Sequence, residues 1–462
     1  MERGFAAIVA REQGLRRSLS AGRMAMIAIG GAIGTGLFLG SGFAISLAGP
    51  AVLLSYAIGA LVALLLMGCL AEMTIAHPTS GSFGAYAEYY LGPLAGFLVR
   101  YAYWTCIVLA VGTEVTAIAL YMHFWFPATP GWPWIVGFSA LLITVNALSV
   151  AAFGTVEYWF SAVKIAAIVV FIALAGILVV RDPAGAAHHY LDYGGLLPHG
   201  WWGAWVAAIM AIFSYLSIEM IAVAAGEAAQ PELAVMRAFR STVVRLILFY
   251  LLTLALVLAV VPWTAVGADE SPFVRVMRAL GVPAAAGILN FVILIAALSA
   301  MNSQLYITTR MMFSLARAGQ APRRLGVVNE RGVPLHSLLL SSLGIAVATV
   351  VSVAAPQSSF ILMVSISAFG AMFTWMMIFV THYYFRRAHQ RAGPAPLRFR
   401  MIGFPVTTVL GALLMAALLA TTAFTEAFRM TLVFGVPFLA GLCGAYLLRQ
   451  RRRAKSSSIE PA

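Results

Sequence analysis

Long apolar runs separated by short polar connections dominate the pattern along the chain. A helix needs about 20 apolar residues to cross the hydrocarbon of a bilayer, and runs of that length recur throughout the 462 residues. We expect about twelve membrane-spanning helices, at residues 24–46, 50–71, 94–123, 132–151, 157–180, 201–226, 241–263, 284–316, 336–355, 358–384, 401–424 and 427–449. The pattern predicts an all-α integral membrane protein, with a solvated loop at 181–199 and a disordered tail around 456–458.

Composition and charge agree with a lipid environment. Hydrophobic residues make up 62% of the chain and charged residues 10%, whereas a soluble domain has about a quarter of its residues charged. The net charge of +13 does not indicate nucleic-acid binding, because the basic residues form short clusters between apolar runs. Alternate connections, starting at the N-terminus, hold 23 of them and the opposite connections hold four. Basic residues accumulate on the cytoplasmic side, so we expect a multi-pass protein of the cytoplasmic (inner) membrane with both termini in the cytoplasm.

Two of the runs are interrupted near their centres. Residues 30–36 (GGAIGTG) hold four glycines, and each weakens a helix by roughly 1 kcal/mol relative to alanine; close packing through small residues is the alternative. Residues 213–219 (FSYLSIE) place Glu219 in the sixth run, where a carboxylate costs at least ~2.5 kcal/mol. The two runs correspond if the first ten spans form two halves of five. Interrupted helices at matched positions indicate a transporter binding site.

A pair of broken helices suits a particular kind of ligand. The free N–H groups at the start of a half-helix carry partial positive charge and favour a carboxylate. The carbonyl groups at the end of the other half carry partial negative charge and favour an ammonium group. Free amino acids have this zwitterionic pattern.

Several motifs, in order along nearly the whole chain, resemble the amino acid transporter branch of the APC (amino acid–polyamine–organocation) superfamily. They are residues 30–38 (GGAIGTGLF), 41–42, 48–50, 72–83 (EMTIAHPTSGSF), 157–160 (EYWF) with Lys164, and Ser299 with 302–303 and 310–311. The resemblance implies a LeuT-like fold, in which a five-plus-five inverted repeat with broken helices 1 and 6 is followed by two peripheral helices. The implied segments are a cytoplasmic N-terminus (1–23), two repeats (24–180 and 201–384), helices 11 and 12 (401–449) and a cytoplasmic tail (450–462).

The resemblance also implies a binding site at the two breaks. The substrate carboxylate is expected at the helix-one break, formed by Ile33, Gly34, Thr35 and Gly36. The amine is expected at helix-six carbonyls around Phe213, Ser214 and Leu216. The Phe213 ring would cover the substrate, although ordinary core packing is the alternative for an aromatic in a membrane helix. The family usually has glycine where this chain has Ser217, so the serine narrows the site or adds a hydroxyl.

Three ionisable residues inside the runs are candidates for proton coupling. Lys164 lies eight residues into the fifth run, and burial disfavours the charged form of a lysine, so it can load and unload a proton. The resemblance places it near the cation position of sodium-coupled relatives; the alternative is a lysine that snorkels to the interface. Glu114 and Glu219 are candidates for proton or amine contacts, or else paired structural carboxylates. Glu72, near a helix end, is expected at the interface.

The predicted function is a secondary active transporter that imports amino acids by proton symport. A proton-independent exchanger is the alternative within transporters, and an amino acid sensor on the same scaffold is a further one. A membrane enzyme is not expected, because the spans hold no clustered catalytic groups, and no repeated pore motif indicates a channel. No cofactor or metal is expected beyond the proton. A neutral or γ-amino acid is favoured as substrate, and the sequence leaves the oligomeric state open.

Overall fold

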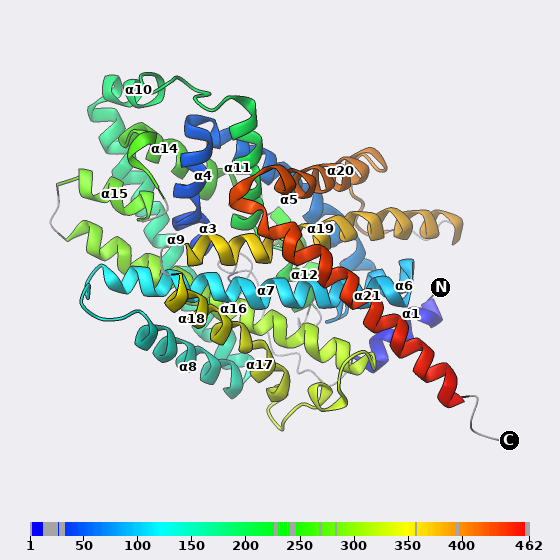
Figure 1. Ribbon diagram of the computed structural model, residues 1–462. Coiled ribbons are helices and arrows are strands. Elements are labelled where there is room, and N and C mark those ends of the chain that lie inside the picture. The colour runs from blue at the N-terminus through cyan, green and yellow to red at the C-terminus, as the bar shows by residue number, and fades with distance from the viewer. Residues whose placement is uncertain are drawn as a thin grey trace.

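The computed structural model describes residues 2–12, 26, 33–225, 230, 232–233, 235–237, 239–240, 246–267, 270–281, 284–355, 358–392 and 397–457. These residues form helices joined by turns and irregular segments, and no strand occurs among them. Figure 1 shows the long helices gathered in one bundle, with α7 (Pro93–His123) running through its middle.

Eight helices of the described chain are long and apolar enough to cross a membrane. In order they are α4 with α5 (Gly40–Ala76), α7, α9 (Val150–Arg181), α16 (Ala285–Arg317), α17 with α18 (Leu335–Ala354), α19 (Ser359–Ala392), α20 with η6 (Val406–Phe424) and α21 (Met430–Ser457). Shorter apolar helices are α8 (Trp132–Leu148), α11 (Gly200–Ser214) and Leu248–Val260, which includes α14 (Thr253–Val260). The prediction of an all-helical membrane protein is confirmed, whereas the count of twelve spans and the inverted repeat stay predictions.

A glycine with a positive φ angle, Gly49, lies between the first two apolar runs. The stretch Gly40–Ala76 has 37 residues, about 55 Å at 1.5 Å per residue, which exceeds the ~30 Å hydrocarbon thickness. Gly49 has φ +61° and lies between α4 (Gly40–Ala48) and α5 (Val52–Ala76). A residue with a side chain rarely adopts this conformation. The chain therefore turns at Gly49, between the predicted runs 24–46 and 50–71.

Helices outside the apolar runs are absent from the sequence predictions. They are α1 (Glu2–Arg11), α6 (Ser82–Leu91), α10 (Pro183–Leu191) and α15 (Pro272–Ala279). The connection predicted as a solvated loop at 181–199 is exposed along α10, which has no buried residue. The prediction is wrong only in that a helix forms there, because Asp182 caps α10 by accepting the Gly185 N–H (2.9 Å). The disordered tail is wrong as far as Ser457, where α21 ends; Ser458 lies outside the described residues.

The helices differ in how much of their surface other helices cover. In the most apolar 18-residue stretch of each helix, 78% of α7 is buried, against 22% of α9 and 17% of α21. α7 packs against α16, α18 and α19, so it forms the centre of the bundle. The exposed surfaces of α9 and α21 are apolar, and such surface is stable only in contact with lipid or another protein. These two helices therefore lie at the rim.

The N-terminal helix α1 is held against the basic end of the bundle. Glu12, which follows α1, is 4% exposed. Its Oε1 accepts the Ser314 hydroxyl (2.7 Å) and lies 3.5 Å from Arg100 Nη2. Its Oε2 accepts the Thr79 hydroxyl (2.8 Å). One carboxylate thus connects α1 to α7, α16 and the connection before α6.

A second carboxylate strengthens this attachment. Glu88 on α6 accepts Arg11 Nη1 (2.8 Å) and Arg100 Nη1 (2.7 Å). Burial alone would raise the pKa of Glu88, but the hydrogen bonds and positive charges of Arg11 and Arg100 outweigh it and lower that pKa. Glu88 is therefore ionised near neutral pH and pairs with both arginines.

Candidate functional site

The first predicted run contains an extended residue, Gly34. This residue has an extended backbone, with φ −137° and ψ −153°, and α3 (Thr35–Phe38) begins directly after it. The first bonds of the new helix run from the N–H groups of Leu37 and Phe38 to Gly34 O (3.2 and 3.3 Å). A helix therefore begins inside the predicted glycine cluster, directly after an extended residue. Residues 30–32 of that cluster lie outside the described residues.

Two glycines of the cluster allow neighbouring helices to approach closely. A Cβ on Gly34 would lie 2.7 Å from Ala300 Cβ on α16. A Cβ on Gly36 would lie 2.7 Å from Ser214 Cα on α11. Real side chains do not tolerate such contacts. Small size, as well as flexibility, therefore explains why glycine occupies both positions.

The sixth helical run is interrupted by a five-residue turn. α11 ends at Ser214, residues 215–219 form the turn, and α12 (Met220–Ala224) follows. Ser217 within the turn has φ +76°, a left-handed conformation that glycine adopts most easily. Its N–H donates to Glu219 Oε1 (3.2 Å). The turn thus uses a side chain in place of the missing helical hydrogen bonds.

Ser214 joins the two interruptions. Its hydroxyl donates to Gly36 O (2.7 Å) and pairs with the Tyr56 hydroxyl of α5 (2.9 Å). The Tyr250 hydroxyl donates to Ser214 O (3.0 Å). The end of α11 and the beginning of the first-run helix are therefore fixed to each other by direct hydrogen bonds.

Glu114 lies beside the helix-one break. It is 3% exposed on α7, and its Oε2 accepts the Thr35 N–H at 3.4 Å. Its Oε1 accepts the Gln304 amide at 3.4 Å. Both contacts are long, so they hold the carboxylate weakly. A carboxylate of the protein therefore lies close to the N–H groups at which the sequence predicts a substrate carboxylate.

Lys164 links the helix-one break to the eighth predicted span. Its side chain on α9 is fully buried. Nζ donates to Ile33 O (3.1 Å) and to the Ser299 hydroxyl of α16 (2.7 Å). The snorkelling alternative is wrong, because the ammonium points into the bundle. The structure thus brings the predicted helices one, five and eight together at one ammonium group.

A buried polar chain continues from this lysine. Glu157 Oε1 lies 4.0 Å from Lys164 Nζ and accepts the Ser299 hydroxyl (2.5 Å). Its Oε2 accepts the Asn302 amide (3.1 Å), and Asn302 Oδ1 accepts the Asn146 amide (2.8 Å). The sequence identified Glu157, Ser299 and Asn302 only as parts of family motifs. Which of these side chains pair depends on how α8, α9 and α16 are each rotated about their own axes. The spacing of residues along the sequence does not determine these rotations.

Glu219 has structural partners. The Tyr103 hydroxyl on α7 donates to its Oε1 (2.6 Å), which also accepts the Ser217 N–H. The carboxylate is fully buried and attaches the helix-six turn to the central helix. The geometry favours the paired structural carboxylate over direct proton coupling for this residue.

The predicted site residues therefore form two groups. Residues 33–36 gather with Glu114 and Lys164 at the helix-one break, whereas Ser217 and Glu219 belong to the helix-six turn. Ser214 connects the groups. Phe213 and Leu216 are each 6% exposed, and the Leu216 N–H donates to Phe213 O (3.1 Å). The roles of these residues in substrate binding stay predictions.

Sequence reasoning missed a further buried carboxylate. Glu72 was expected at the interface, but it is 1% exposed on α5. It lies 3.0 Å from His382 Nε2 and 2.7 Å from Arg386 Nε, both on α19, and it accepts the Met401 N–H (2.8 Å). These partners cover the carboxylate, so it is not exposed, while its position at the membrane interface stays a prediction. Only the position of basic residues near the same helix ends could have suggested the pairing.

Comparison with known proteins gives matches along almost the whole chain. A family model for amino acid permeases matches residues 23–453. The aromatic amino acid transport protein AroP of Escherichia coli (strain K12) is 37% identical over 445 residues, which cover 96% of this chain and 97% of that protein. AroP of Salmonella typhimurium (strain SL1344) has the same identity and coverage. The uncharacterized amino acid permease YtnA of Bacillus subtilis (strain 168) is 36% identical over 441 residues, or 94% and 95% of the two chains.

Proposed function

The chain belongs to the amino acid permease family, and from this premise we propose that it imports amino acids across the cytoplasmic membrane by proton symport with alternating access. Its relatives are permeases, so the chain is a transporter rather than an enzyme. The proposal includes a five-plus-five repeat with two peripheral helices, and both termini in the cytoplasm. The following contacts support the coupling mechanism.

The observation that carries the proposal is the bridge made by Lys164. As an ammonium group it has three N–H donors and no acceptor, which suits the carbonyl of Ile33 and the hydroxyl of Ser299. When the proton leaves, the group loses its charge and one donor. The attraction that holds the helix-one break to α9 and α16 then weakens. Proton loading and the position of the break are therefore linked, as symport requires.

The two acidic candidates support a neutral side chain on the substrate. Glu114 accepts hydrogen bonds from Thr35 and Gln304, and Glu219 accepts them from Tyr103 and Ser217. Both carboxylates thus have protein partners, while the Glu114 contacts are long and Glu219 Oε2 has no partner among the described residues. We propose a neutral amino acid as substrate, and aromatic α-amino acids are the first to test because the AroP relatives are named for them. Nothing in the structure favours γ-amino acids.

Binding of purified protein to each amino acid tests the substrate class. A ligand that binds only the native state stabilises it and so raises the melting temperature. The gain in unfolding free energy is about 2.7 kcal/mol when the free ligand concentration is about a hundred times Kd. We expect one or more aromatic amino acids to raise it, and γ-aminobutyrate and arginine to leave it unchanged. Stabilisation by arginine alone would contradict the neutral class.

Uptake into proteoliposomes tests the coupling. An inward proton gradient should accelerate uptake by the unmodified protein, and Lys164→Gln should remove this acceleration while substrate still stabilises the variant. Ser161→Ala is a matched control, because Ser161 lies one turn earlier on α9 and makes only a 3.4 Å contact to Glu157; it should keep the acceleration. Gradient-driven uptake by Lys164→Gln would refute the role of the lysine. Counterflow that is equally fast with and without the gradient in the unmodified protein would favour the exchanger instead.

A further inference from the structure

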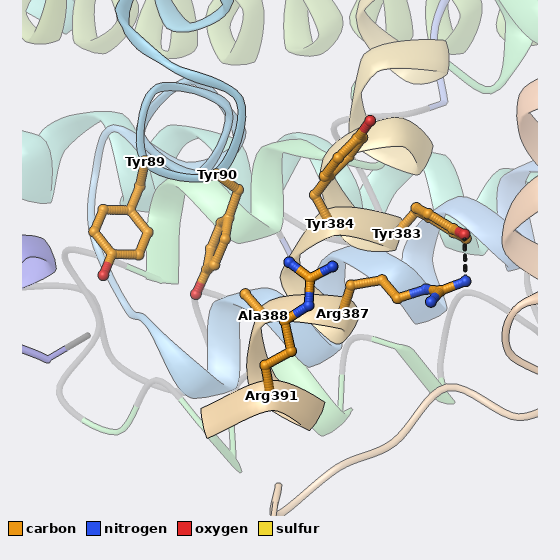
Figure 2. Close-up of a pocket in the computed structure, with 7 residues that line it drawn as sticks. All are labelled: Tyr89, Tyr90, Tyr383, Tyr384, Arg387, Ala388 and Arg391. Carbon is orange, nitrogen blue, oxygen red and sulfur yellow. Dashed lines mark hydrogen bonds between the residues drawn. The ribbon is translucent and has the colours of Figure 1, made fainter. Parts of the chain in front are cut away.

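A cavity of about 660 Å³ lies between the ends of α6 and α19, outside the candidate substrate site. Figure 2 shows its walls, in which the side chains of the two helices face each other. Four tyrosines and two arginines provide most of its lining: Tyr89, Tyr90, Tyr383, Tyr384, Arg387 and Arg391. None of the described residues that line it is acidic. Its chemistry is therefore cationic and aromatic.

The two arginines leave positive charge available to a ligand. Arg387 Nη2 donates to the Tyr383 hydroxyl (2.8 Å), and its guanidinium lies 5.2 Å from the centre of the Tyr383 ring. Among the described residues, no carboxylate forms an ion pair with Arg387 or Arg391. Figure 2 shows the Arg391 guanidinium directed toward the space between Tyr90 and Tyr384. The cavity therefore presents two cations, neither of them neutralised by an acidic side chain.

The position of the cavity relative to the bilayer follows from helix length. α19 has 34 residues, about 51 Å, of which the hydrocarbon takes about 20 residues. Counted from Ser359, about 20 residues reach Ile378. Tyr383 and Tyr384 follow a little more than one turn later, in the interfacial region where tyrosines accumulate. Arg387 and Arg391 follow one and two turns later. Side chains on a helix point toward its N-terminus, so both guanidinium groups are directed back toward the membrane surface.

The opposite wall meets the same interface. Tyr89 and Tyr90 lie at the end of α6, which finishes at Leu91, and the apolar α7 begins at Pro93. The basic residues place this end of both helices on the predicted cytoplasmic side. The inner leaflet of a membrane carries anionic lipids, which attract basic residues at the surface. An anionic group is therefore present in high concentration at the position of the cavity.

We propose that this cavity binds the headgroup of an anionic phospholipid of the inner leaflet. The two guanidinium groups bind the phosphate oxygens, because paired N–H donors of arginine match a phosphate. Tyrosine hydroxyls donate further hydrogen bonds, and the rings pack against the glycerol and the first methylene groups. The headgroup thereby connects α6, next to the N-terminal helix, with the end of α19. Phosphatidylglycerol has the required charge and shape.

Thermal unfolding of the full-length protein in a neutral detergent tests this site. Phosphatidylglycerol should raise the melting temperature, and phosphatidylcholine with the same acyl chains should not. In the double variant R387Q/R391Q, the half-maximal phosphatidylglycerol concentration should rise about thirtyfold, equivalent to about 2 kcal/mol for two cations. The control R323Q/R324Q removes the same charge from the exposed 3₁₀ turn η5 (Arg323–Gly326) on the same predicted side, and should respond like the unmodified protein.

Two further measurements keep the proposal falsifiable. Tyr384→Ala keeps both arginines and should weaken the phosphatidylglycerol response on its own, because the ring no longer covers the lipid; Tyr384 is 51% exposed, so the fold tolerates the change. Inorganic phosphate should stabilise the protein far less than the lipid. The proposal is overturned if the arginine double variant responds like the unmodified protein, if both double variants lose the response equally, or if inorganic phosphate reproduces the effect of the lipid.

Discussion

Ser217 holds a backbone conformation that serine adopts only at a cost, and replacing it gives a sharp test of the helix-six turn. Its φ of +76° is left-handed, which costs a residue with a Cβ roughly 1–2 kcal/mol. Its hydroxyl is buried and has no hydrogen-bond partner among the described residues, which costs about 1–3 kcal/mol. The substrate-free protein therefore stores both costs at this one residue.

Two substitutions separate these costs. Ser217→Ala removes the hydroxyl and keeps the strain, so it should stabilise the substrate-free protein by about 1–3 kcal/mol. Ser217→Gly removes the strain as well as the hydroxyl. Relative to alanine, glycine lowers the stability by roughly 0.5–1 kcal/mol because its unfolded chain has more conformational entropy. It lowers the stability by about 0.8 kcal/mol more because one methyl group fewer is buried. These terms nearly cancel, so we expect the two variants to be about equally stable. At a residue with negative φ, where alanine is not strained, the same comparison would favour alanine clearly.

Equilibrium unfolding in mixed micelles measures these differences, and substrate binding reports on the hydroxyl. If Ser217 Oγ donates to bound substrate, both variants bind more weakly by about 0.5–1.5 kcal/mol, or two- to twelvefold. If it does not, affinity is unchanged and only stability moves. A glycine variant less stable than the alanine variant by more than 1 kcal/mol would refute the strain argument. Loss of stability in both variants would refute the argument from the unpartnered hydroxyl.

Three other predictions concern the helix-one break and the basic end of the bundle. Gly36→Ala should destabilise the protein by about 1–3 kcal/mol in the same unfolding assay, because the new Cβ would lie 2.7 Å from the α11 backbone. The control is Gly176→Ala on α9, where nothing lies within 4 Å of the new Cβ; it should be neutral or stabilising. Glu12→Ala should cost about 1–3 kcal/mol, since it leaves the buried Ser314 and Thr79 hydroxyls without their acceptor, and should speed proteolysis of the N-terminal segment; unchanged proteolysis would contradict the attachment of α1. The lowered pKa of Glu88 means that its pairing stabilises the fold above the unfolded pKa of about 4.3 and is lost as pH falls through the lower folded value. Melting temperatures between pH 7 and pH 3 should therefore fall less in Glu88→Gln than in the unmodified protein, and parallel curves would refute this assignment.

The apolar runs predict most of the fold because lipid imposes a length and a polarity on every span. The helices α1, α6 and α10 escape this reasoning, since no long apolar run marks them. α10 depends on a single capping residue, Asp182. α1 depends on partners more than 60 residues away, such as Thr79, which no local pattern reveals.

The candidate site was predictable in its residue types but less so in its contacts. A lysine and two carboxylates inside apolar runs indicate buried partners, and the breaks follow from glycine and polar positions. Which groups pair depends on helix rotation, so the proximity of Glu114 to Thr35 could not be read from the sequence. Ser217 is a different case. A family position that usually holds glycine suggests a positive φ, and this signal could have predicted the strain as well as the loss of space.

The hydrogen bond from Ser214 to Gly36 O restricts how the molecule can open. Because the Tyr56 hydroxyl also pairs with Ser214, the segments that lead from both interruptions toward the predicted periplasmic face form one rigid unit with α5. Under the proposed alternating access, parting these segments to release a solute on that side would break both hydrogen bonds. We therefore expect the unit to tilt as a whole against α9 and α16, with the rotation taken up at residues 33–34 and 215–219.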